Sequence, residues 1–172
     1  GFDHVFEVAK AAELITNETK ELIKKSNKPR PLISSACPAI VRLIRVKYPA
    51  LIDNIIDILS PMDAAAVLAK ESFCEENGIA KEEVGAFFIT PCAAKITAIK
   101  APLGMDKSAV DGAISIVDMY GMLVGRLNQP FEDDILERAG AMGVGWAASG
   151  GEIAALGVEN SLSVDGIGNV MH

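Results

Sequence analysis

Short apolar runs alternate with longer amphipathic segments along this chain, and this alternation constrains its fold most strongly. Residues 32–33, 84–89 and 113–117 are apolar runs of strand length, and residues 3–8 are also strand-like. Apolar residues recur at helical spacing in 8–26, 39–48, 62–77 and 119–127. Strands that alternate with helices are typical of a parallel sheet with helices on both faces. The sequence therefore predicts an α/β fold, a parallel sheet flanked by helices.

The boundaries of these elements are marked by prolines, a serine and glycines. Pro29 and Pro31 end the first helix, and Ser60 is expected to cap the helix 62–77 with Pro61 in its first turn. The continuous apolar run 84–89 predicts a strand that is covered on both faces. Residues 131–137 are acidic and are expected at the surface, and residues 139–157 are rich in glycine and alanine.

Composition excludes several classes of protein. The 172 residues, half of them apolar, are enough for a single domain, 1–172. A net charge of −7 leaves no basic surface for nucleic acid or an anionic membrane. We see no secretory signal and no apolar run near the roughly 20 residues of a membrane span. Three widely spaced cysteines favour a reducing compartment, so we expect a cytoplasmic protein.

Two cysteines follow predicted strands and lie beside prolines. Cys37 precedes Pro38, and Cys92 follows Pro91. Loops after parallel strands gather at one edge of a sheet, and two thiolates there would suit a soft metal or an iron–sulfur cluster. By residue type and spacing alone, two ordinary buried cysteines are the more frequent explanation. Cys74 falls on a helix and is expected in or near the core.

Seven short segments follow one another in a recognisable order: Phe2-Asp3-His4-Val5-Phe6, Ser34-Ser35-Ala36-Cys37-Pro38, Tyr48-Pro49, Ser60-Pro61, Thr90-Pro91-Cys92-Ala93-Ala94-Lys95, Gly150-Gly151 and Gly166-Ile167-Gly168-Asn169. In this order, and over nearly the whole chain, they resemble the C-terminal domain of iron-only hydrogenases. The resemblance implies an incomplete portion of that family's α/β catalytic fold. The family's opening segment and its final cysteine-rich segment would lie outside residues 1–172, as expected of a piece of a longer protein.

The resemblance also implies a cofactor. The family's domain holds the H-cluster, a four-iron cubane on four cysteines joined to a diiron unit that bears carbon monoxide, cyanide and a dithiolate. Cys37 and Cys92 would be two of the four ligands, and the ammonium of Lys95 would contact a cyanide. With two ligands of four, this chain alone is expected to bind no cluster. Implied partners are H2, protons, and electron-transfer iron–sulfur domains or a ferredoxin.

The sequence departs from the catalytic pattern of the family along its proton path. Ala36 stands where catalytic members have a cysteine that passes protons, and a methyl group cannot do so. Ile56 stands where a relay serine is usual, whereas Glu18 and Glu21 would be the two relay acids. Without the resemblance, two glutamates three residues apart would be read as a solvated helix face.

The pocket that would surround the cluster also differs. Met62 replaces a usual glutamine and Thr90 a usual methionine, beside Pro61 and Pro91. Trp146 and Ala147 replace Phe-Gly, although this single tryptophan could equally be a core residue.

These departures resemble sensory hydrogenases, in which the cluster detects hydrogen or redox state and signals to appended domains. Loss of a proton donor costs about 10²–10⁴-fold in rate, so we expect a slow or sensory parent protein. One alternative is a relative that keeps only a cubane and acts in iron–sulfur assembly or signalling. Another is an α/β regulatory module without metal.

Overall fold

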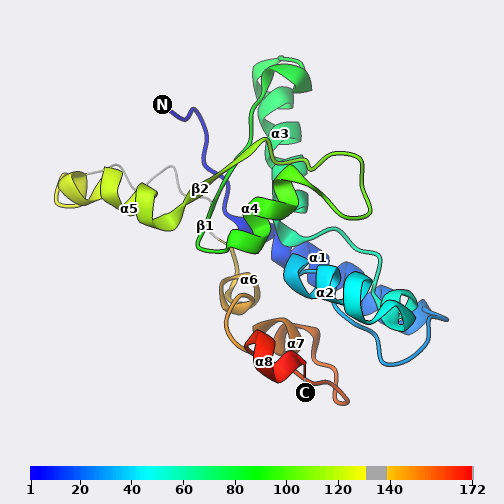
Figure 1. The fold of residues 1–172 in the computed structure, drawn as a ribbon. Coiled ribbons are helices and arrows are strands. Elements are labelled where there is room, and N and C mark those ends of the chain that lie inside the picture. The colour runs from blue at the N-terminus through cyan, green and yellow to red at the C-terminus, as the bar shows by residue number, and fades with distance from the viewer. Residues whose placement is uncertain (131–138, 172) are drawn as a thin grey trace.

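The computed structural model describes residues 1–130 and 139–171, and it combines helices with one short pair of parallel strands (Figure 1). The predicted acidic stretch 131–137 lies outside the described residues. The α-helices are α1 (Val8–Lys25), α2 (Pro38–Lys47), α3 (Pro61–Asn77), α4 (Ala93–Lys100), α5 (Ile116–Leu123), α6 (Ala141–Gly145), α7 (Gly151–Leu156) and α8 (Ile167–Val170). The 3-10 helices are Pro49–Asn54, Lys81–Glu83 and Val124–Arg126, and the strands are β1 (Phe87–Thr90) and β2 (Gly112–Ser115).

The predicted helices 8–26, 39–48 and 62–77 are confirmed, and α3 begins as its sequence indicates. The hydroxyl of Ser60 accepts a hydrogen bond from the main-chain N–H of Asp63 at 3.2 Å, and Pro61 occupies the first turn. Gly78 ends α3 in the left-handed region at φ +66°, a conformation that glycine adopts without strain.

Small side chains allow α1 and α3 to pack closely. Ala11 of α1 is buried against Ala64 and Ala65 of α3. Thr16 and Thr19 are also buried in α1, and each hydroxyl donates to the main-chain carbonyl four residues earlier, at 2.8 and 2.7 Å. The polar atoms of this interface are therefore satisfied within the helix.

The two strands and α4 form a β-α-β unit, as the alternating pattern predicts. β1 and β2 pair in parallel, from Phe87 opposite Gly112 to Thr90 opposite Ser115. Phe88 on one face packs against a buried cluster that contains Met62 of α3. On the other face Phe87 and Ile89 are 54% and 45% exposed. The predicted coverage of both faces is therefore wrong for the described residues, where one face of the strand pair is packed.

Two further strand predictions are wrong in their extent. Residues 3–8 are irregular up to the start of α1, and Val5 is 67% exposed, because no described strand lies beside them to pair with their backbone. Instead, Phe2 packs edge-on against Phe87. Residues 32–33 form only a single parallel bridge, between Ile33 and Ile55.

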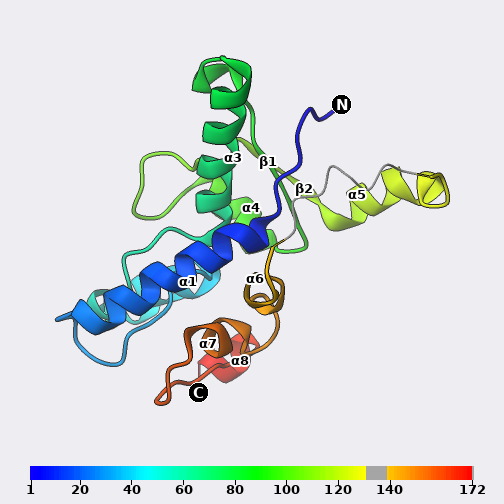
Figure 2. The same cartoon turned by 180° about the vertical axis from the view of Figure 1, so that it is seen from behind.

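The predicted helix 119–127 begins earlier than expected, as α5. The Ser115 hydroxyl accepts a hydrogen bond from the N–H of Asp118 at 3.0 Å and so caps a helix that starts at Ile116. The helix changes to 3-10 geometry at Val124. In both views α5 extends to the side away from α1 and α2 (Figures 1 and 2).

The glycine-rich segment after residue 139 docks on α1. The carboxylate of Glu7 accepts a hydrogen bond from the N–H of Ala139 at 2.7 Å, and that of Glu13 accepts one from Gly143 at 3.1 Å. A Cβ at Gly143 would collide with the carbonyl oxygen of Ala9, so α6 lies too close to α1 for any side chain there.

Among the described helices, none has the length and apolarity needed to cross a membrane.

Candidate metal centre

Each of the two predicted site cysteines directly precedes a helix, in nearly the same backbone conformation. Cys37 is the N-cap of α2 with φ −99° and ψ 105°, and Cys92 is the N-cap of α4 with φ −99° and ψ 109°. The main-chain N–H groups in the first turn of a helix carry partial positive charge, so a negatively charged ligand is well placed there. A thiolate is the form that ligates metal, so both positions suit a metal-binding cysteine.

Serine side chains hold the turn that presents Cys37. The Ser35 hydroxyl donates to the carbonyl of Ile58 at 2.8 Å, and the Ser34 hydroxyl accepts from the N–H of Ala36 at 3.3 Å. These bonds fix the main chain on the N-terminal side of Cys37. Ala36 is half-buried and presents only its methyl group beside the cysteine.

The Cys92 turn is held in a comparable way. Its N–H donates to the hydroxyl of Thr90 at 3.1 Å, and Thr90 is almost fully buried at the end of β1. Pro91 is exposed between them. Strand β1 therefore fixes Thr90, and the Thr90 hydroxyl holds the main chain at Cys92.

Helices α2 and α4 lie against each other, so the two cysteine turns begin neighbouring elements. Cys37 is exposed and Cys92 half-buried, and both are free thiols. Cys74 is buried in α3, as predicted.

Within residues 1–130 and 139–171, no three side chains of histidine, cysteine, aspartate or glutamate come close enough together to hold a metal ion. Two thiolates fit the ligand chemistry of an iron–sulfur cluster, but they are half of the four-cysteine set of a cubane. The role of Cys37 and Cys92 as cubane ligands therefore stays a prediction.

Lys95 lies in the first turn of α4, on the same helix start as Cys92. Its ammonium lies over the ring of Phe88, 5.5 Å from the centroid, in a cation–π arrangement. Lys95 is half-buried, and its charged end lies over Phe88 of β1. The contact with cyanide stays a prediction.

The predicted pocket residues separate into two groups. Pro61, Met62 and Thr90 are buried, and Met62 belongs to the core between α3 and β1. Trp146 and Ala147 lie in the turn between α6 and α7, where Ala147 is exposed. The indole Nε1 of Trp146 is buried and has no hydrogen-bond partner in the part of the chain that the structure describes.

The predicted relay acids lie on the outside of α1. Glu18 and Glu21 are both exposed, and Glu21 forms ion pairs with Lys24 at 2.9 Å and Lys25 at 3.2 Å. Hydrogen bonds from Lys24 and then Lys25, reinforced by their charges, lower the pKa of Glu21. The inward side of this part of α1 carries the two buried threonines. The structure therefore does not bring these glutamates together with the cysteine turns, and their role stays a prediction.

Sequence reasoning missed two groups of polar contacts, one around Asp63 and one at Ser34. The carboxylate of Asp63, 7% exposed, accepts hydrogen bonds from Ser60 at 2.8 Å and from buried Ser108 at 2.6 Å. The Ser60-x-x-Asp63 spacing is a visible capping signal that indicates the first of these bonds. The second contact joins Ser34 to Glu152, 118 residues apart, at 2.7 Å. No local pattern signals that pair.

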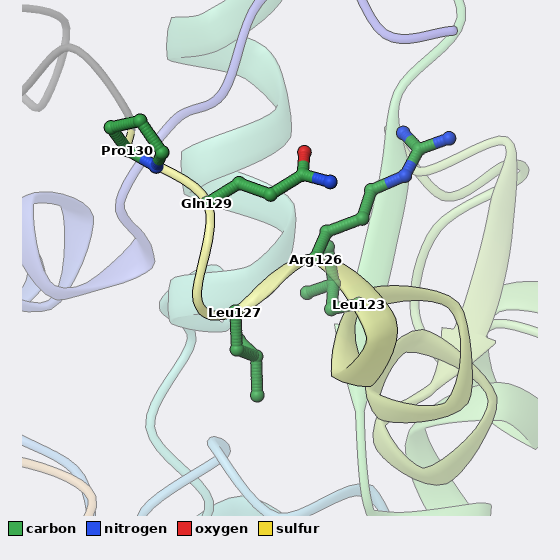
Figure 3. A pocket seen from close by; sticks show the side chains of 5 residues that line it. All are labelled: Leu123, Arg126, Leu127, Gln129 and Pro130. Atoms are coloured by element: carbon green, nitrogen blue, oxygen red, sulfur yellow. The ribbon is translucent and has the colours of Figure 1, made fainter.

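A shallow hollow of about 300 Å³ lies elsewhere, at the end of α5 (Figure 3). It is lined by Leu123, Arg126, Leu127, Gln129 and Pro130, which include no thiol, imidazole or carboxylate. The hollow is therefore unsuited to ligate a metal, and none of the predicted site residues lines it.

Comparisons with known proteins agree with the resemblance in the sequence. A profile of the family described as iron only hydrogenase large subunit, C-terminal domain, matches residues 1–167. Iron hydrogenase 1 of Clostridium pasteurianum is 30% identical over 98 residues, which are 55% of this chain and 17% of that protein. The cytosolic Fe-S cluster assembly factor NAR1 of Candida dubliniensis is 29% identical over 118 residues, 67% of this chain and 20% of that protein.

The fold is also that of a solved hydrogenase. The apo [FeFe]-hydrogenase HydA1 from Chlamydomonas reinhardtii aligns with a TM-score of 0.63 at 23% identity, over 83% of this chain and 39% of that one. This likeness supports the α/β assignment. The chain spans about a fifth of the curated relatives that it matches.

Proposed function

The chain belongs to the family of C-terminal domains of the iron-only hydrogenase large subunit, and we propose that it is part of an oxidoreductase domain in which Cys37 and Cys92 ligate an iron–sulfur cluster. The observation that carries this proposal is the matching geometry of the two cysteines. Both are N-caps of neighbouring helices, with φ and ψ within a few degrees of each other. Cysteine thiolates are the usual ligands of iron–sulfur clusters, and two of them on neighbouring helices would hold one side of such a cluster.

The residues of this chain would divide the work at such a site. Cys37 and Cys92 would hold the cubane, while Lys95 supplies a fixed positive charge one turn along α4 from Cys92. When bound, the H-cluster supplies the redox chemistry of H2 and protons. The remaining ligands would have to come from outside the described residues, and electrons would pass to further iron–sulfur domains or a ferredoxin.

We further propose that the parent protein turns over slowly and serves in sensing. Ala36 presents a methyl group beside Cys37, and the exposed position of Glu18 and Glu21 offers no internal carboxylate path along α1. A missing proton donor lowers rates by about 10²–10⁴-fold. Hydrogen evolution by the matured, full-length protein at the rate of catalytic family members would contradict this proposal.

A second candidate function is iron–sulfur assembly or signalling with a cubane alone. The similarity to the assembly factor NAR1 covers more of this chain than the similarity to iron hydrogenase 1 does. Ala36 and Thr90 also depart from the catalytic pattern, which a protein without the diiron unit would tolerate. Lys95 favours the hydrogenase-type site, because a cubane alone offers no cyanide to contact.

Infrared spectroscopy of the full-length protein, matured anaerobically, separates these functions. Bands of bound carbon monoxide and cyanide would support the H-cluster, whereas a cubane without such bands would support the assembly or signalling function. A protein without iron would be a metal-free regulatory module and would refute both.

Iron analysis of cysteine variants tests the ligand assignment. We expect Cys37→Ala and Cys92→Ala to lose cluster iron, because each removes a thiolate ligand. Cys74→Ala is the matched control, since this cysteine is buried in α3, and it should retain the iron. Equal iron content in all three variants would refute the assignment.

A further inference from the structure

We propose that Glu152 is a positioning residue of the cysteine site: its carboxylate holds Ser34, and Ser34 holds the turn that presents Cys37. This inference rests on the proposed role of Cys37 as a cluster ligand. It connects the glycine-rich segment at the start of α7 to a metal ligand more than a hundred residues earlier in the chain.

The hydroxyl of Ser34 makes two bonds that act together. It donates its proton to a carboxylate oxygen of Glu152 at 2.7 Å and accepts the N–H of Ala36 at 3.3 Å. A serine hydroxyl has one proton and two lone pairs, so donation to Glu152 leaves a lone pair oriented for the Ala36 amide. The bond to a charged acceptor is the stronger of the two, so Glu152 fixes the hydroxyl.

The backbone around Glu152 is built to bring its carboxylate to this place. Gly150 adopts φ +73°, which side chains rarely allow, and turns the chain into α7. At Gly151 a Cβ would collide with the main-chain oxygens of Gly145 and Trp146. The paired glycines therefore let the first turn of α7 pack tightly against the preceding segment, and Glu152 is the next residue. Since α7 also contacts α1, the carboxylate stands on a supported element.

Glu152 and Ser34 are both partly buried, which makes the contact more than a transient surface pairing. The hydroxyl of the neighbouring Ser35 donates to the carbonyl of Ile58. The main chain before Cys37 is thus held by two serine hydroxyls with different partners. Loss of Glu152 would free the Ser34 hydroxyl and leave the Ser35 bond in place.

Residue-resolved amide hydrogen exchange on this chain tests the proposal. We expect Glu152→Ala to speed exchange at the Ala36 amide about tenfold or more, because the Ser34 hydroxyl becomes free to rotate. Glu152→Gln keeps an oxygen acceptor at the same reach and should restore most of the protection. Glu159→Ala is the matched control, since it removes an exposed carboxylate from the same C-terminal segment.

A double-mutant cycle tests whether Glu152 acts on the Ala36 amide through the Ser34 hydroxyl or only by holding the C-terminal segment in place. In a Ser34→Ala background, Glu152→Ala should have no further effect on the Ala36 amide, because the connecting hydroxyl is gone. Unchanged exchange at Ala36 in Glu152→Ala, or a uniform rise across all amides, would overturn the proposal. Should Glu152→Ala fail to fold, Glu152→Met takes its place, because it removes the acceptor oxygens and keeps the length of the side chain. Unchanged exchange at the Ala36 amide in that variant would equally overturn the proposal.

Iron analysis of the full-length protein connects this contact to the cluster. Lower cluster occupancy in Glu152→Ala, restored in Glu152→Gln, would support positioning of the ligand turn, and equal occupancy in both and in wild type would overturn it. An iron-free wild-type protein would instead refute the function proposed for Cys37, while the exchange results at Ala36 would still report on the Glu152 contact.

Discussion

Replacement of Asp63 by alanine tests the polar network that holds α3 near the candidate site. The carboxylate is 7% exposed and accepts hydrogen bonds from Ser60 at 2.8 Å and Ser108 at 2.6 Å. Ser108 in turn accepts the N–H of Val110, which packs against Met62. The alanine variant would leave the hydroxyl of Ser108 buried without its acceptor.

The expected loss of stability follows from these contacts. A buried hydroxyl without a partner costs about 1–3 kcal/mol, and loss of an acidic group in the first turn of α3 costs about 0.3–1 kcal/mol. Relief of the burial of a charged carboxylate offsets part of this. The main-chain capping bond to Ser60 is retained, since it uses the N–H of residue 63. We therefore expect Asp63→Ala to lower the free energy of unfolding by about 2–3 kcal/mol, a large share of the about 5–15 kcal/mol of a typical domain.

Urea unfolding followed by circular dichroism measures this loss. The exposed Asp57 offers a matched control, because Asp57→Ala removes the same charge and should stay within about 0.5 kcal/mol of wild type. Together, Asp63→Ala and Ser108→Ala should couple by at least about 1 kcal/mol. A loss below about 1 kcal/mol for Asp63→Ala, or additive effects of the pair, would refute the reasoning.

Three further predictions test docking, pH dependence and surface charge. Gly143→Ala should lower the free energy of unfolding by about 1–3 kcal/mol in thermal or urea unfolding, because the added Cβ meets main-chain atoms of α1. Gly145→Ala is the control: the space around Gly145 is open, so this change should be neutral or stabilising. Burial raises the pKa of Asp111, but hydrogen bonds from a lysine and a main-chain N–H, with nearby positive charge, outweigh burial and lower it. The folded pKa thus lies below the unfolded value near 4, so the stabilisation is complete above that value and is lost as pH falls through the folded pKa. The lysine is Lys70, whose ammonium forms an ion pair with the Asp111 carboxylate at 2.5 Å. Stability should therefore fall more steeply with acid in wild type than in Asp111→Asn, and identical curves would contradict a contribution from this ion pair. Finally, Lys24→Ala should raise the pKa of Glu21 toward its ordinary value in an NMR titration, and an unchanged titration would show that this pair contributes nothing.

Much of the secondary structure was predictable, because it is encoded in local chemistry. The apolar period of α1, and the serine and proline at the start of α3, act over a few residues. The β-α-β unit followed from the alternation of strand-length apolar runs with segments of helical periodicity. The errors arose where an apolar run alone decided a strand. Residues 3–8 have the composition of a strand, but a strand also needs a neighbour for its backbone, and composition does not supply one.

For the candidate site, sequence alone identified the two cysteine turns and their prolines, since the turn chemistry is local. The resemblance to the family also predicts that Ala36 departs from the catalytic pattern, and this stays a prediction. Sequence alone did not reveal which side of α1 faces inward at Glu18 and Glu21, because the register of a helix against its neighbour depends on packing.

The tertiary structure alone decided the contacts between distant segments. Ser34 meets Glu152 across 118 residues of sequence, and the segment that carries Glu152 packs on α1. In that segment Gly143 lies so close to Ala9 of α1 that no side chain would fit. Lys95 over Phe88 likewise depends on how α4 lies beside β1. The physical reason is the range of the forces: hydrogen bonding in caps and turns acts between near neighbours in sequence, whereas burial joins whatever surfaces fit together in space.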